Sequence, residues 1–584
     1  MRNAKIVCTL GPASSDRETI RELAAAGMSV ARLNASHGSR EDRADLIDRV
    51  RAVDEERTEP VAIMLDTKGP GIRTAPLPDG ETVTLETGSE IRFVEGETAT
   101  PETVGLSVSI DAVEPGDRVL LDDGLIETTV LEHDGDGVRA RVDTGGELSG
   151  RKGVNVPGVE LDLDVVTEKD RADLELAAEK GVDFVAASFV RDAEDVYEVG
   201  EVLEEEGADI PIIAKIERAG AVENLDEIID AAYGVMVARG DLGVECPMED
   251  VPMIQKRIIR KCREAGRPVI TRRRCSIRWS TPGGRRARRR PTWPTRSSTA
   301  PTESCCRPRP RSATIPSRSS TRWIASSARS RLERVRRVAR AAGPGVGRSA
   351  NGRLARSARF LARDIDADAV VAATESGYTA LKTAKYRPGV PVVASTPSQT
   401  VRRQLALTWG VTPLYAPVSD QGADAVVEKA VQAALDAGVA QSGDTVVVLC
   451  GMMTDLEGAN TTNMLKVHVA ADALTTGQVV VEGRSTGPVV RVTDGDLSGV
   501  PDGAILALPA DFDAEFAGDT SRLGGIVNAE RGMTGYPALV ARELELPMIS
   551  DAEIGDLEDG EIVTIDAERG IVYGGEIGDR TERL

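Results

Sequence analysis

Short apolar runs that end abruptly in charged residues constrain the fold of this chain most strongly. The run P-I-I-A-K-I-E contains Lys215 and Glu217, and the run G-V-M-V-A-R-G-D-L-G contains Asp241. Such runs between helical stretches indicate strands that are buried on both faces. Parallel α/β folds place their chemistry at the carboxyl ends of these strands. Two carboxylates and one ammonium there suit a hard metal ion and an anionic substrate, and the alternative is a structural salt bridge.

The first half of the chain alternates strand and helix patterns. K-I-V-C-T-L, S-V-A-R-L-N and P-V-A-I-M-L-D are predicted strands, and an amphipathic helix between the first two stops at Gly27. The same alternation returns at 158–270. Repeated βα units of this kind predict an α/β protein with a (β/α)₈ TIM barrel, here spanning residues 1–72 and 158–345.

Three further domains are predicted from changes in this pattern. Residues 73–157 show short alternating strands with G-D and D-G turns, which indicates a small all-β domain inserted at the carboxyl end of a barrel strand, the position of a lid. Residues 353–470 return to an α/β pattern and predict a separate C-terminal α/β regulatory domain. Residues 475–584 form an acidic, glycine-rich β/α tail.

Composition excludes several classes of protein. No apolar run reaches the ~18 residues that a membrane span requires, and M-R-N-A-K-I-V has no apolar signal core, so we expect a cytoplasmic protein without a membrane partner. The seven cysteines and three histidines lack the spacing of a disulfide framework or a zinc site.

The net charge of −22 conceals a discontinuity. Residues 271–350 hold 22 Arg and two Glu, and removing them from the 72 basic and 94 acidic residues leaves 50 and 92. The other 504 residues therefore carry −42, with only 12 Lys in the whole chain. A strongly acidic, lysine-poor surface predicts a halophilic source, because carboxylates stay hydrated and their repulsion is screened in high salt. It also argues against nucleic-acid binding.

Several long motifs follow one another in order along the chain: K-I-V-C-T-L-G-P-A-S-S, A-R-L-N-A-S-H-G, L-D-T-K-G-P-G-I-R-T, K-G-V-N-V-P-G, A-A-S-F-V-R, A-K-I-E, A-R-G-D-L-G-V-E, T-E-S-G-Y-T-A, R-Q-L-A-L-T-W-G-V and T-T-N-M-L-K-V-H. Together they resemble the motifs of pyruvate kinases. The resemblance covers about 1–271 and 353–470 and is closest to haloarchaeal members. It implies transfer of the phosphoryl group of phosphoenolpyruvate to ADP, giving pyruvate and ATP in the last step of glycolysis.

The resemblance implies roles for individual residues. Lys215 is similar to the lysine that neutralises the phosphoryl group in transit, and Arg32 to the arginine on that phosphate. Glu217 and Asp241 resemble the ligands of Mg²⁺ or Mn²⁺, and Gly240 with Asp241 resembles the backbone that receives the substrate carboxylate. The implied ligands of K⁺ are Asn34, Ser36, Asp66 and Thr67. The implied nucleotide contacts are Arg73, Lys152, Asn34 and His37, although Lys152 and His37 could equally be ordinary loop residues.

Two C-terminal features extend the resemblance. The loop T-E-S-G-Y-T is similar to one that grips the phosphate of a sugar-phosphate or nucleotide effector, through Thr374, Ser376, Gly377 and Thr379; a plain strand-to-helix turn is the alternative. The tail resembles the swivelling phosphohistidine domain of some bacterial members. Tyr536 stands where that domain has its histidine, so we expect a structural or oligomer-stabilising tail. A homotetramer is also implied.

One segment departs from the family. After Thr271 the family continues A-T-Q-M-L-D-S-M-V-H, whereas this chain has R-R-R-C-S-I-R-W-S-T. Codons chosen for the family residues, read after dropping one base, encode all ten residues of this chain. Thr302–Pro316 can likewise be shifted back to D-G-V-M-L-S-A-E-T-A-I-G-D-H-P, the eighth-strand motif of the family. Residues 272–352 therefore have the character of an out-of-frame translation.

This segment leaves alternatives open. A basic insertion that binds nucleic acid is disfavoured, because the segment lacks lysine and replaces sequence instead of adding it. If the chain is made as written, we expect the seventh strand to lose its end and the eighth to be lost, and the active-site threonine of the family falls at Arg273. The alternative to an active pyruvate kinase is thus an inactive relative with scrambled strands 7 and 8.

Overall fold

The structure is a computed structural model of the 584-residue chain. It describes residues 3–78, 81–122, 124–133, 135, 137–159, 161, 163–272, 303–306, 350–417, 423–451, 462–470 and 473–577. The chain divides into two compact units: residues 1–346 with 384–387 and 398–413, and residues 347–383 with 388–397 and 414–584. In the described part of the chain, every helix is too short or too polar to cross a lipid bilayer.

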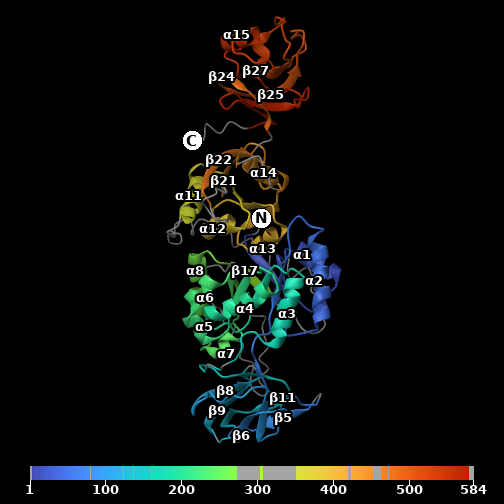
Figure 1. Ribbon diagram of the computed structural model, residues 1–584. Helices are drawn as coiled ribbons and strands as arrows, with labels where there is room; N and C mark the ends of the chain where they lie inside the picture. The colour runs from blue at the N-terminus through green and yellow to red at the C-terminus, as the bar shows by residue number, and fades with distance from the viewer. Residues whose placement is uncertain are drawn as a thin grey trace, which may run out of the picture. The chain divides into compact units, whose positions relative to one another are not determined.

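A closed barrel of parallel strands forms the centre of the first unit. Around the barrel the order is β1-β17-β16-β15-β14-β13-β3-β2. The strands are β1 (Lys5–Leu10), β2 (Val30–Asn34), β3 (Ala62–Asp66), β13 (Phe184–Ala187), β14 (Ile212–Ile216), β15 (Gly234–Val237), β16 (Val269–Arg272) and β17 (Glu303–Cys306). Figure 1 shows blue to green helices flanking these strands: α1 (Arg17–Ala25), α2 (Arg40–Asp54), α3 (Glu168–Glu179), α4 (Ala193–Glu205), α5 (Ala219–Glu223), α6 (Leu225–Ala231), α7 (Leu242–Glu245) and α8 (Val251–Ala265). The predicted α/β barrel is confirmed.

Apolar side chains pack against both faces of the barrel strands. Val7, Met64, Phe184 and Ile213 belong to the interior cluster. A larger cluster, which includes Leu65, packs the outer face of the sheet against the helices. Two-sided burial explains why the strands read as continuous apolar runs instead of alternating ones. The first helix behaves as predicted, with Gly27 at φ +100° just beyond its end.

The expected loss of the eighth strand was wrong. β17 pairs in parallel with β16, from Ile270 opposite Glu303, and with β1, from Lys5 opposite Glu303, so the barrel closes. A strand ladder is built by backbone groups, and it therefore forms even where the local sequence is foreign to the family. β17 occupies the positions at which the shifted reading frame restores G-V-M-L of the eighth-strand motif. Arg273 and the rest of the segment, at 273–302 and 307–349, lie outside the described residues.

An all-β domain is inserted between β3 and α3. Its seven-stranded sheet has the order β4-β12-β8-β9-β10-β6-β7, and β11 pairs with β5 beside it. The strands are β4 (Ile72–Arg73), β5 (Thr82–Leu85), β6 (Glu90–Glu95), β7 (Thr103–Leu106), β8 (Arg118–Leu121), β9 (Ile126–His133), β10 (Val138–Thr144), β11 (Gly146–Ser149) and β12 (Gly153–Asn155). The domain has its own apolar core, as the alternating sequence pattern predicted.

The second unit contains two further sheets. The first has the order β20-β19-β18-β21-β22, comprising β18 (Ala369–Ala373), β19 (Val392–Thr396), β20 (Val411–Tyr415), β21 (Asp444–Cys450) and β22 (Met464–Ala470); part of β20 falls in the first unit. Its sequence neighbours are α11 (Ala350–Asp364), α12 (Tyr378–Tyr386), α13 (Gln399–Leu405) and α14 (Ala423–Asp436). The predicted separate α/β domain is thus confirmed.

The tail forms an eight-stranded sheet with α15 (Tyr536–Glu543). Its order is β23-β30-β29-β25-β26-β27-β28-β24. The strands are β23 (Ala473–Thr476), β24 (Gln478–Val481), β25 (Arg484–Arg491), β26 (Ala504–Leu508), β27 (Leu523–Asn528), β28 (Met548–Ser550), β29 (Ile562–Asp566) and β30 (Ile571–Gly574). β25 contains the run G-P-V-V-R, and β29 pairs with β30 in an antiparallel hairpin.

A buried carboxylate ties the barrel to a helix of distant sequence. Asp183 is fully buried, and its carboxylate lies 2.8 Å from Arg51 Nη1 and 2.8 Å from Arg403 Nε. It also accepts a hydrogen bond from Ile63 N. Removing any one partner of this buried cluster is costly, because the remaining charged groups stay desolvated without a full set of hydrogen-bond partners.

Replacing Asp183 by alanine is therefore expected to destabilise the first unit by about 3–5 kcal/mol, since two arginines lose their partner at a buried site. A drop of several degrees in the melting temperature would report this. Asp45→Ala is the matched control. Asp45 is exposed and forms a surface ion pair with Arg49 at 3.7 Å, and such a pair contributes about 0–1 kcal/mol to stability. Equal stability of the two variants would contradict the expectation.

Candidate active site

A buried cluster of charges lies at the carboxyl ends of β3 and β14. Lys215 Nζ is 3.1 Å from Asp66 Oδ1 and 3.0 Å from Glu217 Oε1. It also donates to Ser188 Oγ at 2.6 Å. Lys215 is 8 % exposed, Glu217 3 % and Asp66 fully buried. One ammonium is thus held between two carboxylates, and the predicted convergence of Lys215 and Glu217 is what the structure contains.

The charges of this cluster depend on one another. Burial disfavours ionised Asp66, but Arg32 and Lys215 outweigh it and hold the pKa of this carboxyl below its ordinary value. Burial also disfavours the ammonium of Lys215, yet Asp66 and Glu217 raise its pKa above the usual range. Burial, with the negative charge of Asp241, raises the pKa of Glu217 despite Lys215. Lys215 is therefore a fixed positive charge, and Asp241 adds a second negative charge near Glu217 that this one ammonium does not offset.

Asp241 follows β15 in a tight turn that leads into α7. Gly243 N donates to Gly240 O at 3.2 Å, and Val244 N donates to Asp241 O at 3.0 Å. Glu217 Oε2 accepts from Phe189 N at 2.8 Å, which orients the carboxylate. Like charges of this kind are relieved by a cation. The donor set therefore fits a divalent metal with two carboxylate ligands.

Dedicated metal cages have more ligands than this. Among the residues that the structure describes, no three or more His, Cys, Asp or Glu side chains gather as a metal-binding group. Mg²⁺ binds through one or two carboxylates when water and substrate oxygens complete its shell, so the arrangement is compatible with a metal that arrives with its substrate.

Arg32 reaches the same cluster from β2. Its guanidinium pairs with Asp66 and donates from Nη1 to Thr9 Oγ1 at 2.8 Å. Arg32 is 4 % exposed, so its charge acts in a poorly solvated environment. Arg32 and Lys215 thus pair with different oxygens of one carboxylate, an arrangement suited to an anion that displaces part of this pairing.

The proposed potassium ligands come from two adjacent loops. Asn34 ends β2 and accepts from Ser36 N at 3.1 Å through Oδ1. Asp66 ends β3, and its carbonyl accepts from Ala35 N at 2.9 Å, which joins the two loops. Thr67 Oγ1 accepts from Ser188 N at 3.1 Å. The structure therefore brings all four residues together at the end of neighbouring parallel strands.

Arg73 and Lys152 lie side by side where the all-β domain joins the barrel. Arg73 in β4 is paired with Gly153 in β12, and Thr74 N donates to Lys152 O at 2.9 Å. Arg73 is exposed, whereas Lys152 Nζ is 3.0 Å from Asp122 Oδ1. The exposed His37 is on the loop after β2, where its N–H donates to Asn34 O at 3.3 Å.

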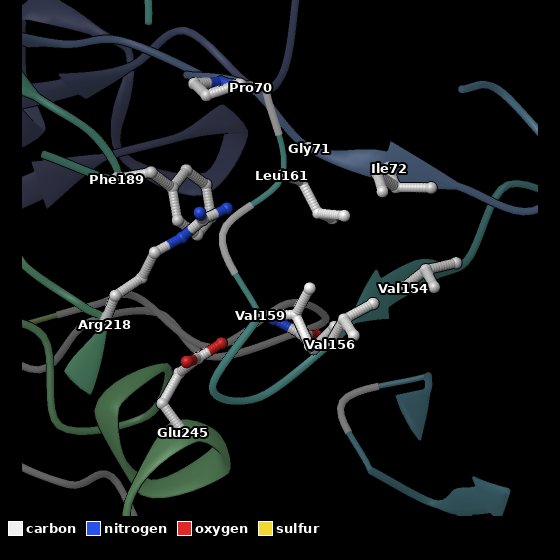
Figure 2. Close-up of a pocket in the computed structure, with 11 residues that line it drawn as sticks. Pro70, Gly71, Ile72, Val154, Val156, Val159, Leu161, Phe189, Arg218 and Glu245 are labelled. Carbon is white, nitrogen blue, oxygen red and sulfur yellow. The ribbon is translucent and has the colours of Figure 1, made fainter. Parts of the chain in front are cut away.

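A small pocket adjoins the charged cluster (Figure 2). Figure 2 shows the Arg218 guanidinium beside the Phe189 ring, 5.4 Å from its centroid, and Glu245 nearby. Ile72, Val154, Val156, Val159 and Leu161 supply an apolar wall. Burial lowers the pKa of Arg218 and raises that of Glu245, and each opposes the shift of the other.

Sequence reasoning missed Ser188, Phe189, Arg218 and Glu245. Ser188 and Phe189 directly follow β13, and the polar Ser188 at a strand end was a usable signal. Glu245 had no such signal, because it lies several residues beyond β15 and reaches the pocket through a separate βα connection. A search for every polar residue one or two positions beyond a predicted strand would have found Ser188 and Arg218.

The proposed effector loop connects β18 to α12. Thr374 N donates to Ser395 O at 2.9 Å, and Thr379 shares a 2.8 Å hydrogen bond with Thr462 through their hydroxyls. Gly377 has φ +81°, and Ser376 is exposed while Thr374 and Thr379 are buried. The loop is thus a strand-to-helix turn in which the Thr379 hydroxyl already has an internal partner.

Comparison with known proteins shows which family has this architecture. A family model described as the pyruvate kinase barrel domain matches residues 1–276, and one described as the pyruvate kinase alpha/beta domain matches 353–468. Pyruvate kinases of Staphylococcus aureus strains MRSA252 and USA300 are each 36 % identical over 592 residues, covering 98 % of this chain and 99 % of theirs. The chain belongs to the pyruvate kinase family. It is therefore an enzyme of the phosphotransferase class, and the resemblance inferred from its motifs is confirmed.

The limits of these matches bear on the anomalous segment. The two pyruvate kinase models leave residues 277–352 uncovered, which is most of the stretch 272–352 that has the character of an out-of-frame translation. Nothing in the comparisons or in the described residues favours an inactive relative over a pyruvate kinase.

The tail has a match of its own. A model described as the mobile domain of PEP-utilising enzymes matches residues 500–570, which confirms the predicted relationship. Tyr536 starts α15, its ring lies 5.5 Å from Phe516, and its hydroxyl accepts from Phe516 N at 3.2 Å. Tyr536 is exposed, and a tyrosine at this position is consistent with a domain that lacks a phosphohistidine; the structural role of the tail stays a prediction.

Proposed function

We propose that this pyruvate kinase performs phosphoryl transfer with Lys215 and Arg32 as the cations that face the moving phosphoryl group. The P–O bond to the enol oxygen of phosphoenolpyruvate breaks, a P–O bond to the terminal phosphate of ADP forms, and C3 of the enolate then takes a proton to give pyruvate. The observation that carries this proposal is the buried Lys215, held at 3.0–3.1 Å by two carboxylates.

Lys215 acts by its charge. The raised pKa of its ammonium keeps it protonated, so it stabilises negative charge on the phosphoryl oxygens without donating a proton. Arg32 adds a second cation, paired with the other oxygen of Asp66, and Arg73 and Lys152 are proposed to contact the phosphates of ADP, with Asn34 and His37 nearby. Gly240 and Asp241 are proposed to receive the carboxylate of the substrate through the turn that precedes α7.

Two metal ions belong to the proposal. Glu217 and Asp241 would hold Mg²⁺ or Mn²⁺, which supplies positive charge next to the substrate oxygens when bound. Asn34, Ser36, Asp66 and Thr67 would hold K⁺ through neutral oxygens and one carboxylate. Ser188 is proposed to orient Lys215, because its hydroxyl accepts from Nζ and donates to Thr67 O at 2.7 Å.

The finer expectations from the sequence remain proposals. They are a cytoplasmic location, a halophilic source, a homotetramer, and an allosteric effector with a phosphate group at Thr374, Ser376, Gly377 and Thr379. The acidic composition supports a halophilic source. The hydrogen bond between Thr379 and Thr462 means that an effector phosphate would have to replace or share that partner.

The test is ADP-dependent release of pyruvate from phosphoenolpyruvate by the purified full chain in the presence of MgCl₂ and KCl. Glu217→Gln is the test variant, because it keeps the side-chain volume and removes one anionic metal ligand. We expect it to lower turnover by about 100-fold or more. Turnover that is independent of ADP, or unchanged in Glu217→Gln, would contradict the proposal.

A further inference from the structure

The first turn of α3 contacts both loops that carry the proposed potassium ligands. Lys169 Nζ donates to Ala35 O at 2.8 Å. Ala35 is fully buried and stands between Asn34 and Ser36, so this bond fixes the backbone from which both of those ligands project. Lys169 lies more than 130 positions away in the sequence, and its position therefore comes from the packing of α3 on the barrel.

The next residue holds the second loop. Asp170 Oδ1 accepts from Lys68 N at 2.8 Å and from Gly69 N at 3.1 Å, immediately after Thr67. Its other oxygen, Oδ2, accepts from Thr167 Oγ1 at 2.6 Å in the capping box of α3. Asp170 is only 1 % exposed. Thr167 N donates to Oδ2 as well, at 3.4 Å, and a buried carboxylate with four donors is committed to one geometry, so it restrains the loop that follows β3.

We propose that Lys169 and Asp170 are positioning residues of the monovalent-cation site, which together hold its two ligand loops in register. This inference rests on the proposed potassium site. A large monovalent ion gains little from each neutral oxygen, so its affinity depends on several oxygens being in place before it binds. Ordering two loops at the moment of binding would cost conformational entropy that these contacts have already removed.

The charge of Lys169 makes the proposal sharply testable. An ammonium near a cation site repels K⁺. If Lys169 acted mainly through its charge, removing it would tighten K⁺ binding. If it acts by holding Ala35 O, removing it will weaken K⁺ binding. The two effects have opposite signs.

The experiment titrates KCl against the full-length protein at constant ionic strength, with tetramethylammonium chloride as the replacement salt. Two readouts are followed: the K⁺-dependent rise in melting temperature and the K⁺ concentration for half-maximal turnover. The variants are Lys169→Met, Lys169→Arg, Asp170→Ala and Asp170→Asn. Lys180→Met is the matched control, because Lys180 caps the other end of α3 and pairs with exposed Asp48 at 2.9 Å.

We expect Lys169→Met and Asp170→Ala to raise the half-saturating K⁺ concentration by about 10-fold or more, as residues behind metal ligands do. Turnover at saturating K⁺ should stay within about threefold of the parent, since the Lys215 cluster is untouched. Lys169→Arg can still donate to Ala35 O, and Asp170→Asn can still accept from Lys68 N and Gly69 N. Both should therefore recover most of the K⁺ affinity, and Lys180→Met should match the parent.

The outcomes distinguish failure of the proposed potassium site from failure of the positioning role of Lys169 and Asp170. A parent protein that does not distinguish KCl from tetramethylammonium chloride has no potassium site, and both proposals fail. A parent that responds to K⁺, with an equal or tighter response in Lys169→Met, overturns the positioning role alone. If Asp170→Ala does not fold, Lys169→Met and Lys169→Arg still decide, because Lys169 is exposed and its replacement leaves the core intact.

Discussion

Restoring the reading frame of the pyruvate kinase family over residues 272–352 is expected to raise turnover by at least about a hundredfold over the chain as written. By sequence resemblance, Arg273, which lies outside the described residues, aligns with a threonine expected beside the metal and the enolate. A guanidinium there would repel a divalent cation, and losing one preorganised active-site group costs about 10²–10³ in turnover. Because β17 closes the barrel in the chain as written, the expected defect is in the chemistry more than in the barrel.

The comparison requires two full-length proteins, one encoded as written and one with a base restored before codon 272 and a base removed near codon 352. Arg273→Thr in the chain as written is the intermediate variant, and it should recover only part of the activity, because the remaining foreign residues are still present. ADP-dependent pyruvate release measures all three. Equal turnover in the written and restored chains would contradict the expectation, and sequencing codons 265–360 of the gene shows which chain is natural.

Replacing Lys215 by methionine in the frame-restored protein is expected to lower kcat by about a thousandfold. Methionine fills a similar volume but removes the charge that faces the phosphoryl group, and single cationic groups in phosphoryl transfer contribute about 10³–10⁵ in rate. The Michaelis constant for ADP should change far less than kcat, because the lysine acts chiefly on the transition state. Steady-state kinetics with both substrates varied measures this separation.

The same variant should also be less stable. Asp66 and Glu217 lose their shared ammonium, which leaves two buried carboxylates with Arg32 as the remaining close cation of the cluster. Lys261→Met is the matched control, because Lys261 pairs with the exposed Asp226 on the outer helices. A kcat within tenfold of the parent, in a folded Lys215→Met protein, would show that the lysine is not the phosphoryl cation.

The active-site residues that the sequence revealed share one property. Lys215, Glu217, Asp66 and Asn34 all lie at the carboxyl end of an apolar run, and parallel strands bring such ends to one edge of the barrel. Their proximity therefore follows from the strand pattern once the barrel is assumed. The sequence motifs add the roles, because the same charged residues could otherwise form only a structural salt bridge.

Other contacts could not be predicted in this way. The lysine of α3 that binds Ala35 O, and the aspartate beside it that holds the loop after β3, belong to a helix whose sequence reads as an ordinary capped amphipathic helix. Arg218 and Glu245 line the same pocket as Phe189 because two βα connections fold onto the same end of the barrel. The prediction that the eighth strand would be lost was wrong, because it judged strand pairing by side-chain character, whereas backbone groups make the pairing.

The sequence by itself determined the class of chemistry, since Lys215, Glu217 and Asp241 stand at the ends of buried strands within family motifs, and it located the one segment that departs from the family. Only the tertiary structure decided how the charges share partners, that β17 closes the barrel, and that α3 restrains two ligand loops at once. The physical reason is that strand ends are set by local periodicity, whereas hydrogen bonds between residues more than 100 positions apart exist only after the helices have packed on the barrel.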